Sequence, residues 1–585
     1  MTDRKDCKKE RCGRCRKCCC KGEWKSCCPV TVSDLTNIVP PPQETSGPIV
    51  PESPFYDQTF VNLGEQGSLY RNNEAEPSLA INPRDKDNLV AFFQQDRWTN
   101  GAAVADRVRF SKDGGKTWRD PTVPFPTSRF QDPAFGRQFA PPFGLYDRAS
   151  DPWIRFGKDG VVHALFETVF TVAEGYNTSI TDVYHSKSVD GGDTWSPPVL
   201  VAASDETTLS LDKMTMTVDP VFPHILYVAV TNYIDEYGDF TLPSQGIFVR
   251  SIDGGATWEP LKAVVEFTVP PDGNTPEPIG AQVAALNDGT LLFVYGVDSF
   301  FGMYEGATNM EFVRSFDRGV TWDPMRYKIG DIVRPTDPLP SEVFPNNPGD
   351  YELDIPIRAQ YVIPGLTVNQ KNNYVYVTWQ DSRYNTLGRC GSVITFSANK
   401  GDSWSYPMPV NPTSLDVQSF LPTPASFGDR GHVAVLFYDF RFDVSGDNQL
   451  TTDVWVNIFN KDLSKMIQQI RLTPQSFDMR QAIRVSGGSF FPGDYMDLQP
   501  QGKCGLGAIY VCTNQLGLFP PTTLAPATVE PLNHQDPVFT AIVPCAKNNH
   551  CLPVFDMHSI PRPSLTSRTL LAKSSLKRRQ RREKL

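Results

Sequence analysis

The phrase SKDGGKTW at 111–118 returns as SVDGGDTW at 188–195, SIDGGATW at 251–258 and SFDRGVTW at 315–322. A weaker copy, SANKGDSW, lies at 397–404. The tryptophans that close the five copies are 77, 63, 64 and 82 residues apart. A phrase that returns at such spacings indicates that the chain is built from repeated structural units.

Each copy of this turn phrase has the composition of a tight turn between two strands. A strand is expected to end at the serine, and the next to begin at the Thr-Trp pair. Glycine adopts the positive φ that such turns require, and the aspartate side chain accepts hydrogen bonds from N–H groups of the turn. These aspartates are therefore expected to be structural, and the tryptophan to pack between neighbouring sheets.

The residues around the turn phrase predict four antiparallel strands in each unit. In the first unit, strands are expected at 77–82, 88–95 and 107–111, and a fourth begins after the turn. Helical periodicity is nearly absent. Repeated units of four antiparallel strands form a β-propeller, so the predicted fold class is all-β.

The number of units sets the size of the ring. A partial seventh unit, with strands expected at 493–500, 506–514 and 537–544, follows six complete ones, and segment 58–64 is the candidate for its last strand. We therefore predict seven blades, with six as the alternative. The six complete units are expected at 77–125, 149–203, 211–267, 278–333, 359–412 and 420–474.

Charge divides the chain into an acidic body and two basic ends. Residues 1–28 carry ten Lys/Arg against four Asp/Glu, and residues 561–585 carry nine against one. Since the whole chain carries −10, residues 29–560 carry −24. An acidic body argues against simple nucleic-acid binding by the propeller, whereas the ends are suited to polyanions.

The predicted domains follow these divisions. Residues 1–54 are expected to be a Cys-rich basic tail and a Pro-rich linker, 55–515 the propeller, 516–560 an extension that completes the last blade, and 561–585 a basic disordered tail. The first 28 residues hold eight of the 13 cysteines. A thiolate zinc site, disulfide cross-linking to neighbours and acylation are alternatives to a plain tether.

The sequence does not name a compartment. It contains no apolar stretch near the ~20 residues of a membrane span. Its N-terminus lacks the apolar region of a secretory signal, so classical secretion is not predicted.

The turn phrase resembles that of the Asp-box (BNR-repeat) propellers of the sialidase-like superfamily, over about residues 70–515. The resemblance implies a glycoside hydrolase, nominally an exo-alpha-sialidase acting on terminal sugars of glycans. Other segments resemble a bacterial-type subgroup that often carries this label: RASDPWIRFGKDG (148–160), VYVTWQDSRYN (375–385), VAVLFYDFRFD (433–443), FDMR (477–480) and FFPGDYMDL (490–498).

A site is expected on the face opposite the turn phrase, where second strands end and first strands begin. Converging polar groups at one mouth of the ring predict a ligand site. Two alternatives remain: each Asp-x-Arg pair fixes its own loop, or clustered carboxylates hold a Ca²⁺ ion. The positions concerned carry Asp96 and Arg97, Asp381 and Arg383, Asp439 and Arg441, and also Glu76, Asp151, Arg358, Asp494 and Tyr495.

The resemblance to sialidases implies a role for several of these residues. In that chemistry arginines bind the sugar carboxylate, a tyrosine assisted by a glutamate attacks the anomeric carbon, and an aspartate acts as acid and base. Asp96 or Asp106 matches the acid/base and Tyr495 the nucleophile. The other candidates are Glu167 or Glu311 as the partner glutamate, and Arg97, Asp151, Arg358, Arg383, Arg441 and Asp494 as substrate-binding residues; no metal ligand is assigned.

One position departs from the family pattern. The family's first arginine stands at the start of blade one, where this chain has Ala75 or Glu76, and a carboxylate there would repel a sialic acid. Arg97 is the nearest substitute. Two functions therefore stay open: a glycoside hydrolase that requires no cofactor, and a non-catalytic glycan- or protein-binding propeller that serves as a surface or particle component.

Overall fold

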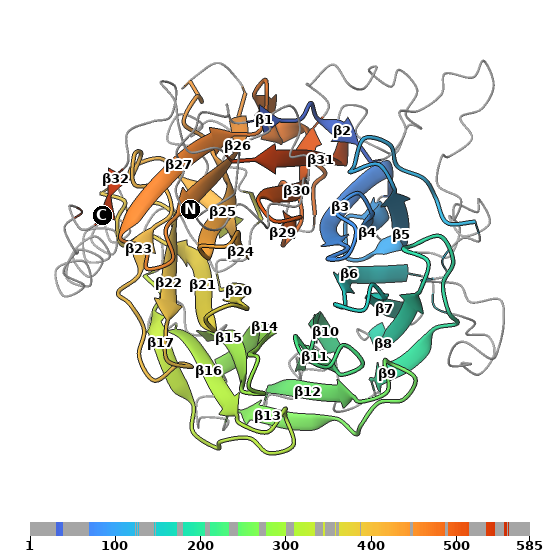
Figure 1. Cartoon of the computed structure of the whole chain (residues 1–585). Helices are drawn as coiled ribbons and strands as arrows, with labels where there is room; N and C mark the ends of the chain where they lie inside the picture. The colour runs from blue at the N-terminus through green and yellow to red at the C-terminus, as the bar shows by residue number, and fades with distance from the viewer. Residues whose placement is uncertain are drawn as a thin grey trace, which may run out of the picture.

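The computed structural model shows an all-β protein of antiparallel strands (Figure 1). Among the described residues the helical part is one 3-10 turn, η3 (Met479–Gln481), and this part contains no helix long and apolar enough to cross a membrane. The structure describes residues 31–38, 69–122, 125, 127, 146, 148–171, 179–204, 211–232, 244–267, 276–299, 309–333, 343–344, 357–358, 362–386, 388–444, 449–485, 489–513, 534–544, 555–557 and 560.

Three sheets have the predicted four strands in sequence order. In each, three successive hairpins join four strands, so the chain runs from an inner to an outer edge. The sheets are β10 (Leu211–Val218), β11 (Leu226–Asn232), β12 (Gln245–Ser251) and β13 (Lys262–Glu266); β14 (Pro276–Ala285), β15 (Leu291–Ser299), β16 (Asn309–Ser315) and β17 (Tyr327–Asp331); and β20 (Gly365–Asn369), β21 (Tyr374–Asp381), β22 (Gly391–Ser397) and β23 (Met408–Pro409).

The first two predicted units form one seven-stranded sheet. A single residue pair, Ala103 with Ala149, links β5 to β6. The fourth strand expected after the first turn phrase is reduced to one bridge, between Phe110 and Arg119. The strands are β3 (Leu69–Ile81), β4 (Leu89–Trp98), β5 (Ala103–Ser111), β6 (Arg148–Phe156), β7 (Val162–Thr171), β8 (Ser179–Ser188) and β9 (Val199–Ala203).

The sixth unit is extended at its outer side by a distant segment. Strand β32 (Phe555–Asp556) pairs with β27, and β28 (Phe477–Asp478) pairs with β26. A separate two-stranded sheet joins β18 (Val343–Phe344) to β19 (Ile357–Arg358). The four main strands of the sixth unit are β24 (Ser419–Phe427), β25 (His432–Asp439), β26 (Thr451–Phe459) and β27 (Lys465–Arg471).

The last sheet is built from both ends of the chain. Strands β29 (Asp497–Gln501), β30 (Gly505–Thr513) and β31 (Gln535–Val543) form a meander. Its outer edge is paired with β1 (Thr31–Val32) and β2 (Thr36–Asn37), which lie in the segment expected to be a tail. The outer-strand position is thus taken by residues 31–37, and the candidate segment 58–64 lies outside the described residues, as do both basic ends.

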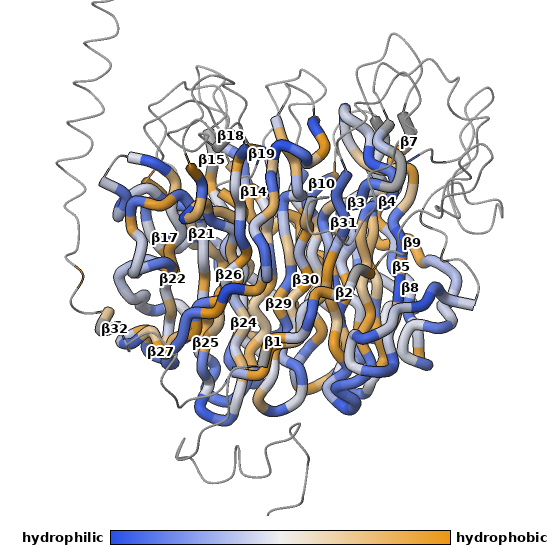
Figure 2. The backbone as a smooth tube through the Cα atoms, turned by 90° about the horizontal axis from the view of Figure 1, so that it is seen from above, coloured by the Kyte–Doolittle hydropathy of each residue, from blue (hydrophilic) through white to orange (hydrophobic). Residues whose placement is uncertain are grey.

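The sheets surround a common axis, with β3, β6, β10, β14, β20, β24 and β29 innermost (Figure 1). Hydrophobic colouring runs through the strands, and blue segments concentrate in the connecting turns (Figure 2). Asp497 of β29 joins the last sheet to the first: its Oδ2 accepts hydrogen bonds from Leu79 N (3.0 Å) and Ser78 Oγ (3.3 Å). The architecture is therefore of the β-propeller type.

The turn phrase forms the predicted hairpin in a fixed pattern of hydrogen bonds. The Ser251 hydroxyl and the Thr257 N–H donate to Asp253 Oδ1, both at 2.9 Å, and the Thr257 hydroxyl donates to Oδ2 at 2.6 Å. Burial alone would raise the pKa of Asp253, but these donors lower it to about 2. The same bonds recur around Asp113, Asp190 and Asp317. In the weaker copy Asn399 accepts the first two bonds, and its Nδ2 donates the third to the Ser403 hydroxyl.

The turn phrase also fastens each sheet to the one before it. The tryptophan packs on an aromatic ring of the preceding sheet, as Trp322 does on Phe248 (4.9 Å between ring centroids) and Trp258 on His185 (5.4 Å). The second glycine lies against the same ring, with a positive φ of 80° at Gly255 and 82° at Gly319. The prediction that these tryptophans pack between sheets is confirmed.

Candidate functional site

A β-bulge interrupts the innermost strand of five units at equivalent places. One residue in each bulge has a positive φ and lies where the register with the second strand shifts. A bulge re-aims a side chain and is frequent next to active sites. The five residues are Glu76 (φ 53°), Asp151 (50°), Lys213 (54°), Gly280 (63°) and Leu421 (52°).

The bulges help to assemble a buried group of charged side chains that we call the central cluster. It contains three of the bulge residues and groups from three other strands and one loop. Its members are Glu76 of β3, Arg97 of β4, Asp106 of β5, Asp151 of β6, Lys213 of β10, Arg358 of β19, and Asp494 and Tyr495, which precede β29.

Lys213 connects two carboxylates of the central cluster. Its Nζ lies 2.9 Å from Asp494 Oδ2 and 3.3 Å from Asp151 Oδ2. Arg358 Nη2 reaches the same oxygen of Asp494 at 3.3 Å. Burial would raise the pKa of Asp494, but Arg358 and Lys213 hold it below its usual value. Asp494 is therefore a buried anion.

Glu76 is the protonated partner in this arrangement. Its Oε2 accepts a hydrogen bond from Gln94 Nε2 (2.5 Å), and its Oε1 accepts one from the backbone N–H of Asp494 (3.3 Å). Burial first, and then the carboxylate of Asp151, raise the pKa of Glu76 to about 8, although Lys213 acts in the opposite direction. At pH 7 the side chain is therefore mostly a neutral carboxylic acid.

Asp106 and Arg97 are an acidic and a basic side chain of the central cluster that share no hydrogen bond. Asp106 is fully buried, and within the described part of the chain neither of its carboxylate oxygens has a hydrogen-bond partner. The same holds for Nε and Nη1 of Arg97. Burial, then Asp151 and Glu76, raise the pKa of Asp106 well above its usual value. Buried polar atoms normally have partners, so these two side chains indicate a place for a polar ligand.

Two guanidinium groups meet at one phenyl ring. The Cζ atoms of Arg97 and Arg358 lie 5.1 Å and 5.0 Å from the centroid of Phe491. Burial lowers the pKa of Arg97, Glu76 raises it and the neighbouring Arg358 lowers it further. Such a pair of guanidinium groups can bind an anionic group in a forked manner.

Tyr495 lies across the sheet boundary from β6. Its ring meets Trp153 edge to face with 5.6 Å between centroids, and its hydroxyl donates to the carbonyl of Pro152 at 3.4 Å. Burial, then the carboxylates of Glu76, Asp151, Asp106 and Asp494, raise its pKa well above the usual value. Tyr495 is therefore a neutral phenol that needs a proton acceptor before it can attack a substrate.

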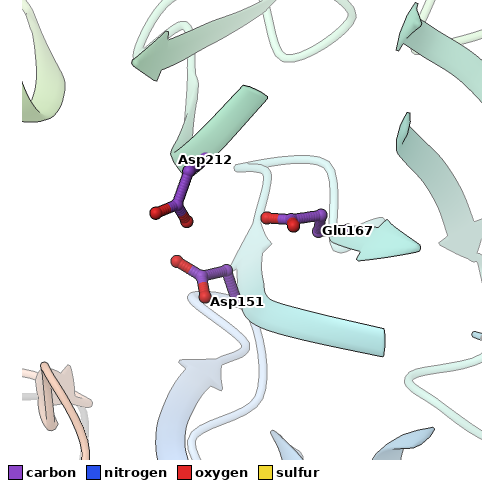
Figure 3. Close-up of side chains that lie close together, drawn as sticks. All are labelled: Asp151, Glu167 and Asp212. Carbon is purple, nitrogen blue, oxygen red and sulfur yellow. The ribbon is translucent and has the colours of Figure 1, made fainter. Parts of the chain in front are cut away.

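A second acidic group borders the central cluster. The carboxylates of Asp151, Glu167 and Asp212 turn toward one another from β6, β7 and β10 (Figure 3). One carboxylate oxygen of each residue lies within 4.8 Å of those of the other two. The ammonium of Lys213 stands beside two of them, 3.3 Å from Asp151 and 3.8 Å from Asp212. The lysine ammonium thus already places a positive charge beside this acidic group. A Ca²⁺ ion at this position stays a prediction.

A cavity of about 220 Å³ runs along the inner strands beside the central cluster. Its wall combines charged and apolar side chains. The charged and polar lining residues include Asp151, Lys213, Asp494 and Tyr495, and the apolar ones include Ile363, Pro364, Leu421 and Pro422.

Several predicted site residues lie elsewhere. Asp96 accepts a bond from Gln95 Nε2 (3.1 Å) and influences Glu74 rather than Glu76. Arg383 bonds to Asp381 (Nε to Oδ1, 2.8 Å) and Arg441 to Asp439 (Nη2 to Oδ2, 2.5 Å). Each arginine thus pairs with the aspartate two residues before it, as expected under the alternative in which an Asp-x-Arg pair fixes its own loop. Glu311 lies on β16, the third strand of its sheet, and accepts a hydrogen bond from the Tyr295 hydroxyl (3.3 Å).

Sequence reasoning missed Lys213 and misread Glu76. The segment LDKMTMTV offers no motif that singles out the lysine, and Glu76 was expected to be an anion that repels acidic sugars. A usable signal existed in each case: Glu76 and Lys213, like Asp151, are charged residues close to the expected starts of their units at 77, 211 and 149. The direction of the Glu76 and Lys213 side chains depends on the β-bulge, which cannot be recognised from the sequence.

Known proteins offer distant likenesses. No protein-family profile matches the chain. It is 28% identical over 189 residues to the xyloglucanase Xgh74A of Acetivibrio thermocellus, which covers 31% of this chain and 18% of that protein. The chain thus spans less than a fifth of the length of this curated relative.

Solved structures give a similar picture. A Penicillium chrysogenum alpha-L-arabinanase complexed with arabinobiose aligns with a TM-score of 0.40 and 16% identity, covering 74% of this chain and 99% of that one. The Trypanosoma rangeli sialidase in complex with 2,3-difluorosialic acid aligns with a TM-score of 0.36 and 14% identity, covering 68% and 54%. Likenesses of this strength do not assign a substrate.

Proposed function

We propose that the protein is a carbohydrate-active propeller, a glycoside hydrolase of exo-alpha-sialidase type that acts on an anionic terminal sugar at the central cluster. The observation that carries the proposal is the pair Asp106 and Arg97. Both carboxylate oxygens of Asp106, and Nε and Nη1 of Arg97, lack partners among the described residues, and the two side chains come from neighbouring strands. A sugar that bears both a leaving oxygen and a carboxylate would satisfy the two.

Each role follows from the state of the side chain. Asp106, whose pKa burial raises well above its usual value, donates a proton to the leaving oxygen as general acid. Arg97 and Arg358 hold the anionic group of the sugar beside Phe491. Tyr495 attacks the anomeric carbon while a nearby carboxylate accepts its proton. All of these groups belong to the chain, so the proposed reaction requires no cofactor.

The proposal also addresses the missing family arginine. Glu76 stands in its place, yet with a pKa of about 8 it is neutral at pH 7 and does not repel an anionic sugar. Arg97 supplies the positive charge from the adjacent strand. As part of the same proposal, the chain is a member of the Asp-box propeller family with seven blades, the last of which is completed by residues 31–37.

A substrate panel tests the proposal. Wild-type protein is assayed against fluorogenic sialoside, glucuronide and arabinofuranoside and against xyloglucan oligosaccharides, beside D106N, Y495F and the surface control D429N. Asp429 pairs with Lys371 on the exposed surface, so its loss leaves the central cluster intact. We expect turnover of an acidic sugar by wild type and D429N, and a loss of about 10²–10⁴-fold in D106N when the same sugar carries a sugar-alcohol leaving group, which must be protonated.

The non-catalytic function remains the second candidate, because Glu76 replaces a family arginine. Under it, wild type binds an acidic glycan on a glycan array but turns over no member of the panel. That result would sink the hydrolase proposal and favour the binding module.

A further inference from the structure

Lys213 is a buried ammonium with three acidic neighbours from different segments. Its side chain is 8% exposed, and its Nζ lies 2.9 Å from Asp494, 3.3 Å from Asp151 and 3.8 Å from Asp212. Asp494 precedes β29, Asp151 belongs to β6 and Asp212 to β10. A buried charge is costly unless it is paired, and removal of one partner leaves the others uncompensated.

The backbone at Lys213 is shaped to bring this charge inward. Its φ of 54° lies in the left-handed region that residues other than glycine seldom adopt. The register between β10 and β11 shifts between Asp212 and Thr215, so Lys213 occupies the bulge. The equivalent position in the next sheet is Gly280 and in the β24 sheet Leu421, so the fold itself does not require a lysine here.

We propose that Lys213 is a positioning residue, which ties the carboxylates of Asp151 and Asp494 into one charged unit beside Glu76 and Asp106. The inference rests on the proposed function for its catalytic meaning, but the charge relationship itself is a property of the free protein. The titratable and charged groups that face or border this unit are Glu76, Arg97, Asp106, Glu167, Asp212 and Arg358.

The direction of each electrostatic effect agrees with this role. Burial would lower the pKa of Lys213, but Asp151, Asp212 and Asp494 raise it well above the usual value, so the ammonium stays charged. Lys213 in turn lowers the pKa of both Asp494 and Glu76. A neutral residue at 213 is therefore expected to raise both pKa values and to move protons onto the cluster.

The experiment compares K213M and K213R with wild type and with K371M, which removes an exposed lysine from its pair with Asp429. The first readout is the carboxyl ¹³C shift of Glu76 against pH in free protein labelled at glutamate, with the signal assigned by its loss in E76Q. We expect a midpoint near pH 8 in wild type, K213R and K371M, and a higher midpoint in K213M. An unmoved midpoint in K213M overturns the proposal.

The second readout is the pH profile of kcat/KM on the substrate found by the panel. K213M is expected to lose more than tenfold in kcat and to shift both limbs to higher pH, whereas K213R keeps the limbs in place. Equal losses and unshifted limbs in K213R and K213M overturn the role. If K213M does not fold, the double variant D494N/K213M, which removes both charges of the pair, is tested instead. Under the proposal the double variant folds. A double variant that also fails to fold overturns the proposal.

The two readouts separate the two claims. If the wild type turns over no substrate, the proposed function fails, while the glutamate titration in the free protein still decides the effect of Lys213 on Glu76.

Discussion

The backbone of Gly255 lies directly against the imidazole ring of His185, although the two residues belong to neighbouring sheets. A β-carbon at Gly255 would collide with Cε1 and Nδ1 of that ring. Trp258, three residues later, packs on the same imidazole. One turn therefore fastens two sheets through a glycine and a tryptophan, and the copies at 111–118, 315–322 and 397–404 do the same on Phe539, Phe248 and Phe312.

G255A is expected to destabilise the protein more than G254A does. Both glycines have positive φ, 80° and 71°, so the backbone strain of an alanine is similar at the two sites. At Gly254 the nearest atom to a new β-carbon would be Lys187 Nζ at 3.5 Å, which is ordinary contact. Chemical denaturation should show an additional loss of about 1–3 kcal/mol for G255A. Equal losses would mean that the close approach to His185 has no energetic weight.

The double variant H163L/H185F should resist acid better than wild type. His163 Nδ1 lies 3.0 Å from His185 Nε2 in a buried stack, and burial lowers the pKa of His163 to about 3 and that of His185 well below 6.5. The unfolded chain takes up these protons near pH 6.5 and the folded one does not, so wild-type stability falls as pH drops below 6.5.

Leucine and phenylalanine occupy the equivalent places in the β14 sheet, as Leu292 and Phe312. The melting temperature of the double variant, followed from pH 7 to pH 4, should therefore decline less steeply than that of wild type. Parallel curves for the two proteins would remove the histidine pair as a source of acid sensitivity.

D253N should destabilise the protein less than D253A. Asn399 already replaces the aspartate in the weaker copy and still accepts the Ser397 hydroxyl (3.0 Å) and the Ser403 N–H (3.0 Å). Alanine loses every acceptor at this point, at a cost of about 1 kcal/mol by thermal or chemical denaturation. If both variants lose the same stability, the carboxamide does not support the turn in the way Asn399 suggests.

The same aspartate should give the turn a pH dependence. The pKa of Asp253 is about 2 in the folded protein, below its value in the unfolded chain, so its contribution is present above about pH 4 and is lost as pH falls toward 2. D253N removes this dependence, and the difference in stability between wild type and D253N should shrink on acidification. A difference that stays constant would contradict it.

Removal of divalent cations should leave turnover unchanged. The carboxylates of Asp151 and Asp212 already have the Lys213 ammonium beside them, so a cation is supplied by the chain. Activity measured after dialysis against EDTA should equal that of the untreated protein. A loss that Ca²⁺ restores would instead assign the acidic group of Figure 3 to a metal.

The sequence predicts the repeated hairpins well because their chemistry is local. Ser251, Asp253, Gly255 and Thr257 lie within seven residues and hold the turn by themselves. Even the irregular copy has a local explanation: Arg318 replaces a glycine, keeps a positive φ of 59°, and reaches Asp219 of the preceding sheet at 3.2 Å.

Features that depend on distant pairing were harder to predict. Strands β1 and β2, within residues 31–37, pair with β31, which lies about 500 positions away in the sequence. Each has only two residues, which is too short for a strand pattern to be recognised. The central cluster is similar: Asp106 and Tyr495 were found from the family resemblance, whereas Lys213 faces inward because of a register shift that only the paired strands reveal.

The central claim, that Asp106 is the proton donor of a glycosidase, is tested most directly by one pair of rate constants. kcat/KM of D106N relative to D429N is measured on two glycosides of the same sugar, one with an activated phenolic leaving group and one with an ordinary sugar alcohol. The account predicts a loss of about 10²–10⁴-fold for the alcohol and a much smaller loss for the phenol, which leaves without protonation. Equal losses on both substrates, or no loss on either, would contradict it.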